Sequence, residues 1–183
     1  MRIISGEFRG RRLETPKGND PRPTADMIKE SVFNIIQFEI QSARVLDLFC
    51  GTGQMGLEAL SRGAEHCVFV DASAPALELA RRNIKLCGVS ERADTVRTFA
   101  LSYLNGIPEN HFDIIFIDPP YDTDLTEKTV RRILEFDKLR DNGIMVCETR
   151  ADYVLPDAPE PRYARREYRY GKIKITLYRK NAD

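Results

Sequence analysis

The sequence predicts an α/β fold in which a mostly parallel sheet carries helices on both faces. Stretches typical of strands and of helices alternate along most of the chain, as in parallel sheets whose strands are joined by crossover helices. A glycine-rich turn follows an apolar run that begins at Val45. Near the end of the chain, two strand-like stretches flank Gly171 and predict an antiparallel hairpin that extends the sheet.

The chain begins with a hairpin and a helix. Residues 1–21 predict an N-terminal β-hairpin around a glycine-rich turn. Apolar residues then recur at helical spacing from Ile28 to Ile40, and they predict a helix with Pro23 ahead of it and Thr24 as its cap.

Glycine and serine mark the ends of the next helices. Gly63 stops one helix, while Ser73, Pro75 and Gly88 mark the start and the end of the following one. The first strand begins at Val45. The later predicted helices are 55–62, 74–87 and 125–136, and the later predicted strands are 67–71, 93–97, 112–117, 143–147, 162–170 and 172–179.

The glycine-rich turn predicts a site for a nucleoside-containing cofactor. Gly51, Gly53 and Gly56 have the spacing G-x-G-x-x-G. The first two glycines let the backbone approach a ligand closely, and the helix that follows presents free N–H groups. Asp71 closes the next strand-like run, where an acid would hold the ribose hydroxyls. The alternative is a set of tight turns in an ordinary α/β sheet.

The motif Asp118-Pro119-Pro120-Tyr121 directly follows the apolar run 112–117, where a buried strand should end. The Asp118 carboxylate and the Pro119 carbonyl can each accept a hydrogen bond from an exocyclic amine, and the Tyr121 ring offers a face for a base. We therefore interpret the four residues as the catalytic site of group transfer to a nucleobase nitrogen. The alternative is that the proline pair only ends the strand, because proline has no N–H for the ladder.

Both motifs resemble those of methyltransferases. The stretch from Asp47 to Gly53 resembles the first motif of class I S-adenosylmethionine (SAM) methyltransferases, in which an acid lies four positions before the first glycine. The stretch from Asp118 to Tyr121 is similar to the motif of enzymes that methylate exocyclic amines of bases. NAD-binding Rossmann domains share the glycine spacing but usually lack the acid. The resemblance implies a Rossmann-like fold, a seven-stranded sheet and SAM as the cofactor.

A narrower resemblance covers nearly the whole chain. Residues 4–13, 22–35, 56–64 and 177–180 resemble the RsmD family, bacterial enzymes that methylate guanine N2 in 16S ribosomal RNA of the small subunit. The resemblance implies a single methyltransferase domain over 1–183, with 1–21 as an RNA-binding extension. The cofactor-binding residues that it implies are Arg22, Thr24, Asp47, Phe49, Gly51, Gly53, Asp71, Ala72, Ala100 and Asp118.

The chain departs from the family pattern after the third strand. Where the family usually has an acid that contacts the adenine amino group, this chain has Thr98, Phe99 and Ala100. Backbone groups would then have to recognise adenine.

Composition predicts one soluble, cytoplasmic domain, and we expect the protein to be a monomer. A chain of 183 residues with 42% hydrophobic content suffices for one core and is short for two. No apolar run approaches the roughly 20 residues that span a bilayer, and the start lacks the pattern of a secretory signal. The chain has two histidines and no C-x-x-C pair, so neither a metal nor a disulfide is predicted for its cysteines, which are Cys50, Cys67, Cys87 and Cys147.

Charge is balanced overall, at 28 basic and 28 acidic residues, but it is unevenly distributed. Residues 1–22 carry six Lys or Arg against three acids and residues 162–180 carry eight against one, whereas residues 23–161 carry fourteen against twenty-three. The N-terminal residues predicted to bind the RNA backbone are Arg9, Arg11, Arg12 and Lys17. The alternative is that the basic ends are solvated hairpins with polar outer faces.

Three classes of function therefore compete. The first is a methyltransferase that acts on an unpaired or flipped-out guanine of 16S ribosomal RNA. The second is an NAD-dependent oxidoreductase with the same glycine spacing, and the third is an RNA-binding module without catalysis. Amino-methylation of DNA is a rival within the first class, and the early hairpin with residues 22–24 favours ribosomal RNA.

Overall fold

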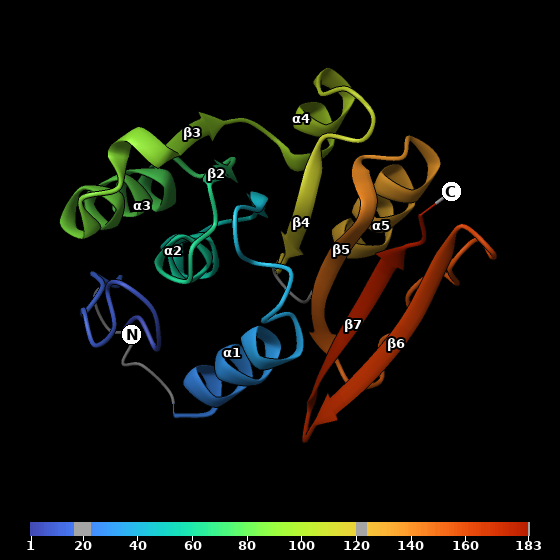
Figure 1. The fold of residues 1–183 in the computed structure, drawn as a ribbon, viewed down its shortest axis with the longest axis horizontal. Coiled ribbons are helices and arrows are strands. Elements are labelled where there is room, and N and C mark those ends of the chain that lie inside the picture. Colours follow the sequence, from blue (N-terminus) through green and yellow to red (C-terminus); the bar gives the residue numbers. More distant parts are fainter. Residues whose placement is uncertain (17–22, 120–123, 183) are drawn as a thin grey trace.

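The computed structural model describes residues 1–16, 23–119 and 124–182, with no side chains described for residues 23–25. A seven-stranded sheet forms its centre, in the order β3-β2-β1-β4-β5-β7-β6 (Figure 1). The strands from β3 to β5 are mutually parallel, and β7 and β6 are antiparallel additions. This architecture confirms the predicted fold class.

The elements follow one another in alternation. The helices are α1 (Pro23–Ile35), α2 (Gln54–Ser61), α3 (Ala74–Cys87), the short 3-10 helix η1 (Ser90–Arg92), α4 (Ala100–Gly106) and α5 (Leu125–Glu135). The strands are β1 (Arg44–Leu48), β2 (His66–Asp71), β3 (Ala93–Arg97), β4 (Phe112–Ile117), β5 (Leu139–Arg150), β6 (Tyr163–Tyr170) and β7 (Ile173–Lys180).

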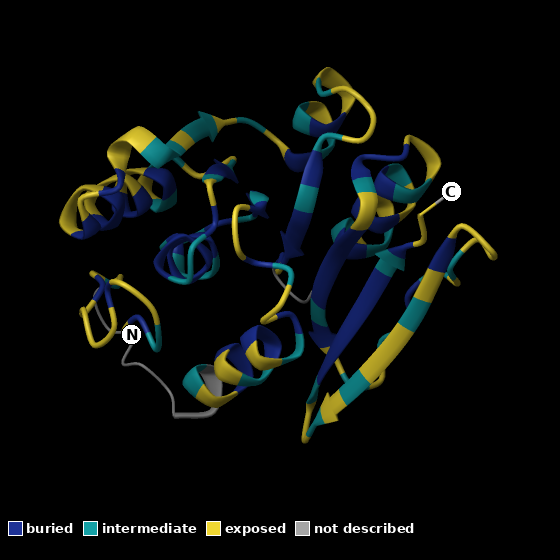
Figure 2. Cartoon of the chain, viewed as in Figure 1, coloured by how far each residue is buried: buried dark blue, intermediate teal, exposed yellow. Residues whose placement is uncertain are grey.

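Two apolar cores lie on the two faces of the sheet. Strands β4, β5 and β7, which lie between them, are mostly buried (Figure 2). Alternate residues of a strand point to opposite faces, so Val45 packs with α1, α2 and α3 while Leu46 packs with α4 and α5. All four cysteines are buried in these cores. In the part of the chain that the structure describes, no helix is both long and apolar enough to cross a bilayer.

Most predicted boundaries are confirmed to within one or two residues. The α3 helix has Ser73 at its N-cap, with the Ser73 hydroxyl accepting from the Ala76 amide, and Gly88 at its C-cap with a φ of 73°. Such local signals act within one turn of the helix, which is why the sequence reveals them.

Four expectations differ from the structure. Helix α1 ends at Ile35, so Ile36 and Ile40 lie beyond it. Helix α1 begins at Pro23, so Thr24 lies in the first turn and is not the cap; proline suits the first helical position because its missing N–H needs no partner there. Helix α4 was not predicted, because its seven residues bury only Ala100 and Leu104 and show no periodicity. Strand β5 begins at Leu139, earlier than expected.

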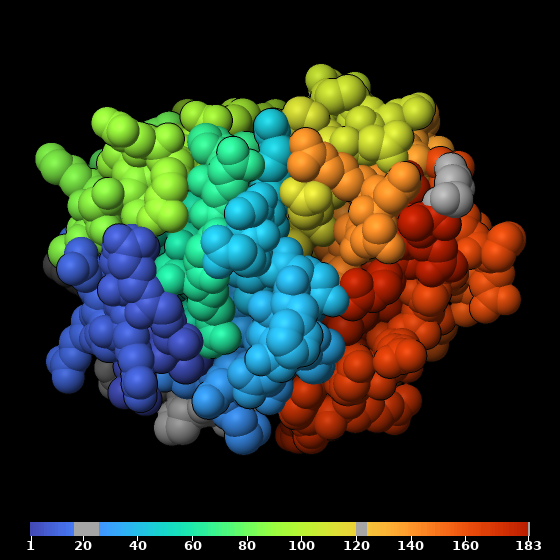
Figure 3. Space-filling model, viewed as in Figure 1, coloured from blue at the N-terminus to red at the C-terminus, as the bar shows by residue number. Residues whose placement is uncertain are grey.

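Residues 1–16, the N-terminal hairpin, pack against α1, α2 and α3 (Figure 3). One antiparallel bridge joins Arg2 and Arg12, and the Ile3 amide donates to the Arg11 carbonyl at 2.9 Å. The hairpin is thus held by a few backbone bonds and by apolar side chains that enter the larger core, namely Ile3, Phe8 and Leu13.

Candidate active site

The candidate site lies where the order of the parallel strands reverses. Strand β1 has β2 on one side and β4 on the other, although β4 comes much later in the chain. Ligands of open α/β sheets bind outside the carboxyl ends of strands at such a point. Leu48 pairs with Ile117, so Phe49 and Asp118 are the next residues to leave the sheet from neighbouring strands. The structure therefore brings the glycine loop and the Asp118 motif together.

The loop after β1 has a backbone that turns sharply. Phe49, Gly51 and Gly53 have φ angles of 62°, 53° and 78°, all in the left-handed region. Only glycine adopts this region without strain, so Phe49 is the unusual residue, and such strain concentrates at functional sites. A Cβ added to Gly51 would meet no atom of the described residues within 4 Å, so the loop leaves space for a ligand there.

Asp47 fixes the loop from inside the protein. Its side chain is almost fully buried, and its carboxylate accepts a hydrogen bond from the Gly56 amide at 2.9 Å. This bond satisfies an N–H in the first turn of α2, whose N-cap residue Gly53 has no side chain to do so. The pKa of Asp47 is raised to about 7, mainly by burial and also by the charge of the nearby Asp71, while the hydrogen bond from the Gly56 amide lowers it.

Gly56 allows α2 to approach the sheet. A Cβ at this position would lie 2.4 Å from the Phe69 ring and 2.6 Å from the Cys67 sulfur. The third glycine of the motif therefore allows α2 to pack closely against β2, and it does not face a ligand.

Asp71 ends β2 beside the same loop. One of its carboxylate oxygens accepts from the Gly51 amide at 3.0 Å and the other from the Ser73 amide at 2.8 Å. Each oxygen keeps a further lone pair, so the side chain can still accept hydrogen bonds from a ribose. The predicted role of Asp71 is compatible with this placement.

Asp118 follows β4 and has an exposed side chain, whereas Pro119 is buried. The pKa of Asp118 is nevertheless raised to about 8, first by desolvation and then by the charges of Glu148 and Asp47. The two observations are compatible, because a carboxyl can contact solvent on one side while protein atoms surround it closely on the others. Its neighbour Glu148 follows Cys147, the β5 residue that pairs with Ile117.

Four carboxyl groups thus lie at or near the carboxyl ends of four adjacent strands, on Asp71, Asp47, Asp118 and Glu148. They raise one another's pKa where they interact, as Asp71 does for Asp47 and Glu148 does for Asp118. Mutual repulsion of this kind is relieved by a cation. The site is therefore suited to a positively charged ligand and unfavourable for a phosphate at the glycine loop.

Phe99 and Ala100 lie beyond β3 at the same edge of the sheet. The Phe99 side chain is 72% exposed, and the preceding Thr98 amide donates to the Asp71 carbonyl at 3.2 Å. Ala100 begins α4 with its methyl group in the core, so only its backbone could meet a ligand. Ala72, next to Asp71, is exposed.

The predicted RNA-binding arginines differ in their surroundings. Arg11 donates to the Leu86 carbonyl and lies 5.7 Å from the Phe8 ring centroid, so it also holds the hairpin against α3. Arg9 and Arg12 are exposed, and their guanidinium groups have no partner among the described residues. Several basic residues of the C-terminal hairpin are used internally, as in the ion pairs of Arg165 with Asp157 and Glu167.

Some predicted site residues fall outside the description. Pro120, Tyr121, Arg22 and Lys17 lie outside the described residues, as does the side chain of Thr24. Glu148, in contrast, is a candidate site residue that the sequence motifs did not indicate. Its position directly after the apolar run 143–147 was the available signal, because the neighbouring strand β4 ends directly before Asp118.

Comparison with known proteins gives matches along the full chain. The family described as "Conserved hypothetical protein 95" matches residues 1–179. Bacillus subtilis YlbH is 37% identical over 98% of this chain and 99% of its own length. "Ribosomal RNA small subunit methyltransferase D" of Haemophilus influenzae is 34% identical over 97% of this chain and 93% of its own. The solved structure of Escherichia coli yhhF has a TM-score of 0.87 at 32% identity, covering 100% of this chain and 99% of that one.

Proposed function

This chain belongs to the RsmD family, and we propose that it transfers the methyl group of SAM to the exocyclic N2 amine of a guanine in 16S ribosomal RNA. The name of the Haemophilus influenzae relative supports ribosomal RNA of the small subunit as the substrate. The observation that carries the proposal is the placement of Asp118 beside the glycine loop at the reversal of strand order.

The charge of the site favours SAM over NAD. SAM carries a sulfonium and an ammonium group, whereas NAD would bring a doubly charged pyrophosphate to the glycine loop. The acids Asp47, Asp71, Asp118 and Glu148 attract the first ligand and repel the second. The open backbone at Gly51 fits the methionine portion, and the Asp71 carboxylate fits the ribose hydroxyls.

Asp118 and Pro119 orient the attacking amine. When bound, SAM supplies an electrophilic methyl group and leaves as a neutral thioether that keeps the electron pair of the broken C–S bond. The guanine amine is a weak nucleophile because its lone pair is delocalised into the ring. If the Asp118 carboxylate and the Pro119 carbonyl accept hydrogen bonds from its two N–H groups, the lone pair points toward the methyl carbon, and such positioning lowers the barrier by several kcal/mol. Asp118 or water then takes the proton that nitrogen loses.

The target base must leave a helix to reach this site. A guanine stacked in a duplex could not present its amine to Asp118, so it is unpaired or flipped out, at a cost of a few kcal/mol. We assign Tyr121 the role of stacking on that base.

SAM affinity is expected to rise with pH. The sulfonium favours the ionised form of Asp47 on β1, whose pKa is raised to about 7 in the free protein. Below this pH the carboxyl must lose its proton when SAM binds, and above it the carboxylate already exists. Titration calorimetry at pH 6 and pH 8.5 should show Kd falling by about three- to tenfold, since one pKa unit is worth 1.36 kcal/mol.

S-adenosylhomocysteine is the matched control for this experiment, because it has the same amino acid and nucleoside but lacks the sulfonium charge. Its affinity should change less over the same pH range. Parallel pH profiles for the two ligands would show that the acids do not face the sulfonium.

We further assign to Phe99 the contact with adenine that an acid makes in most of the family. Its exposed ring lies next to the strand that ends in Asp71, and a flat apolar face can stack on a base. The Phe99→Ala variant should bind SAM about tenfold more weakly by calorimetry, because stacking is worth about 1–3 kcal/mol for each base. Phe99→Tyr, which keeps the ring, should bind like the wild type. Unchanged affinity of the alanine variant would contradict this role.

The proposed function is tested by incubating unmodified 16S ribosomal RNA and small subunits with labelled SAM, followed by nucleoside analysis. The expected product is N2-methylguanosine. Methylated adenine in DNA would favour the DNA enzyme instead. Stabilisation by NAD and not by SAM in thermal unfolding would favour an oxidoreductase.

A further inference from the structure

A polar cavity of about 410 Å³ lies between the N-terminal hairpin and α1, apart from the glycine loop. Its charged lining residues are three arginines, Arg2, Arg9 and Arg62, and one acid, Glu30. Ser5 and Asn34 add further hydrogen-bonding groups. The lining is therefore positive, in contrast to the acidic carboxyl edge of the sheet.

Arg62 is the most firmly positioned of the three arginines. Its side chain is only 13% exposed, its Nε donates to Glu58 at 2.8 Å, and its guanidinium carbon lies 4.8 Å from the Phe33 ring centroid. Its two terminal nitrogens have no partner among the described residues. A guanidinium held in this way loses little freedom when it binds a second ligand, and its planar fork matches phosphate oxygens.

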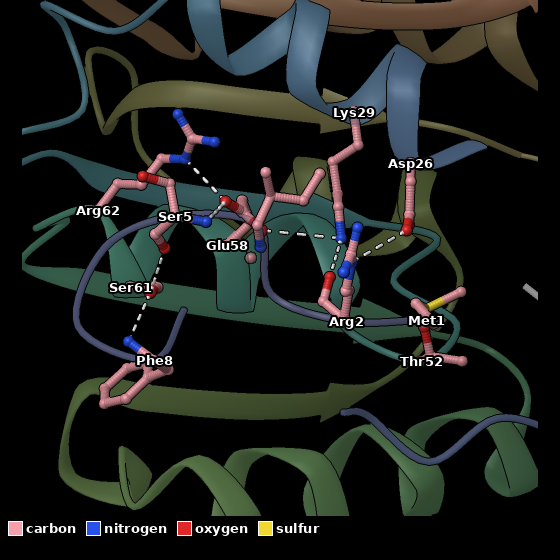
Figure 4. Close-up of polar contacts among 12 residues, drawn as sticks. Met1, Arg2, Ser5, Phe8, Asp26, Lys29, Thr52, Glu58, Ser61 and Arg62 are labelled. Atoms are coloured by element: carbon pink, nitrogen blue, oxygen red, sulfur yellow. Dashed lines mark hydrogen bonds and ion pairs between the residues drawn. The ribbon is translucent and has the colours of Figure 1, made fainter. Parts of the chain in front are cut away.

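Glu58 holds Arg62 and the hairpin in place (Figure 4). Its carboxyl is fully buried and accepts from the Ile4 amide at 2.8 Å and the Ser5 amide at 3.0 Å, in addition to Arg62. Lys29 of α1 lies 3.7 Å from the same carboxyl and donates to the Arg2 carbonyl at 2.6 Å. The Glu58 carboxyl, which interacts with both Arg62 and Lys29, thus joins the hairpin, α1 and α2 beside the cavity.

The other two arginines lie at the rim. Arg9 has no partner among the described residues. Arg2 is 66% exposed and lies 3.6 Å from Asp26, a contact too long for a strong pair. Glu30 on α1 would repel an anion, but three arginines line the same cavity. The balance of charge and the fork geometry indicate a phosphate ligand.

We propose that this cavity binds a backbone phosphate of the RNA substrate, at a nucleotide that flanks the methylated one. The inference rests on the proposed function for the identity of the nucleic acid. Helix α2 begins at the glycine loop and ends just before Arg62, and its eight residues span roughly 12 Å. A phosphate at Arg62 is therefore remote from the reacting amine, and it contributes to RNA binding without touching the chemical step.

The test compares Arg9→Gln, Arg62→Lys and the double variant with the wild type. Arg62→Lys keeps the positive charge beside Glu58 but removes the fork, and Arg9→Gln removes no intramolecular contact, so both proteins should fold. RNA binding is measured by fluorescence anisotropy over a series of salt concentrations, and kcat and KM are measured in the transfer assay. Arg131→Gln on α5, on the opposite face of the sheet, is the matched control.

The double variant should bind RNA at least about tenfold more weakly, and its salt slope should fall by about one. Its SAM affinity and its kcat at saturating RNA should stay within about twofold of the wild type. RNA binding no weaker than that of Arg131→Gln would overturn the inference, as would a fall in kcat without a change in KM. Anisotropy measures RNA binding without turnover, so unchanged binding by the double variant contradicts only this inference. The proposed function fails only if the wild type does not methylate RNA.

Discussion

Replacing Asp118 by alanine is expected to lower kcat for methyl transfer by about 100- to 1000-fold, while SAM affinity changes by less than about threefold. The carboxylate is an acceptor that holds an amino hydrogen in the transition state, and losing one such preorganised group typically has an effect of this size. SAM binds to groups on β1 and β2 that the substitution leaves intact. The measurements are a single-turnover transfer assay and titration calorimetry on the same protein.

Asp157→Ala is the control for this variant, because it removes an exposed acid whose partner, Arg165, also pairs with Glu167. It should retain wild-type kcat. A loss of SAM binding in Asp118→Ala equal to the loss of activity would make Asp118 a cofactor or folding residue. The wild-type rate should also rise with pH toward the pKa of Asp118, which is about 8. Only the ionised carboxylate both accepts the hydrogen bond from the amine and carries the negative charge.

Replacing Glu58 by alanine is expected to lower the free energy of unfolding by about 3–5 kcal/mol. The substitution leaves Lys29 and Arg62 without their shared buried anion, and it removes the acceptor of the Ile4 and Ser5 amides. Urea denaturation should show the loss. Hydrogen exchange at Ile4 and Ser5 should accelerate, because these two amides lose their acceptor on α2.

Two further variants test whether the loss of stability comes from this buried network or from removing any glutamate of a helix. Glu58→Gln keeps one acceptor oxygen and should be less destabilising than Glu58→Ala. Glu78→Ala removes a glutamate from the neighbouring helix α3, where the side chain is 57% exposed, and should change stability by no more than about 0.5 kcal/mol. If Glu58→Ala were as stable as Glu78→Ala, the buried network would contribute nothing to the fold.

Local features of the sequence were sufficient for most of the fold. The caps Ser73 and Gly88, the glycine loop and the apolar strands each act through neighbours within a few residues, so their pattern is visible in the chain. The alternation of these elements predicted a mostly parallel sheet, which the structure confirms. Helix α4 was missed because tertiary packing, and not periodicity, stabilises its two turns.

The family, the glycine loop and the positions of Asp71 and Asp118 at strand ends could be predicted from the sequence alone. The full burial of Glu58, an acid on a helix, is visible only in the folded protein, because its partners Ile4 and Ser5 lie 54 and 53 residues away in the chain. The same holds for Glu148, which comes beside Asp118 through the pairing of β4 with β5. A charged residue has no local signature of burial, since its pKa and its partners depend on which distant segments the fold brings next to it.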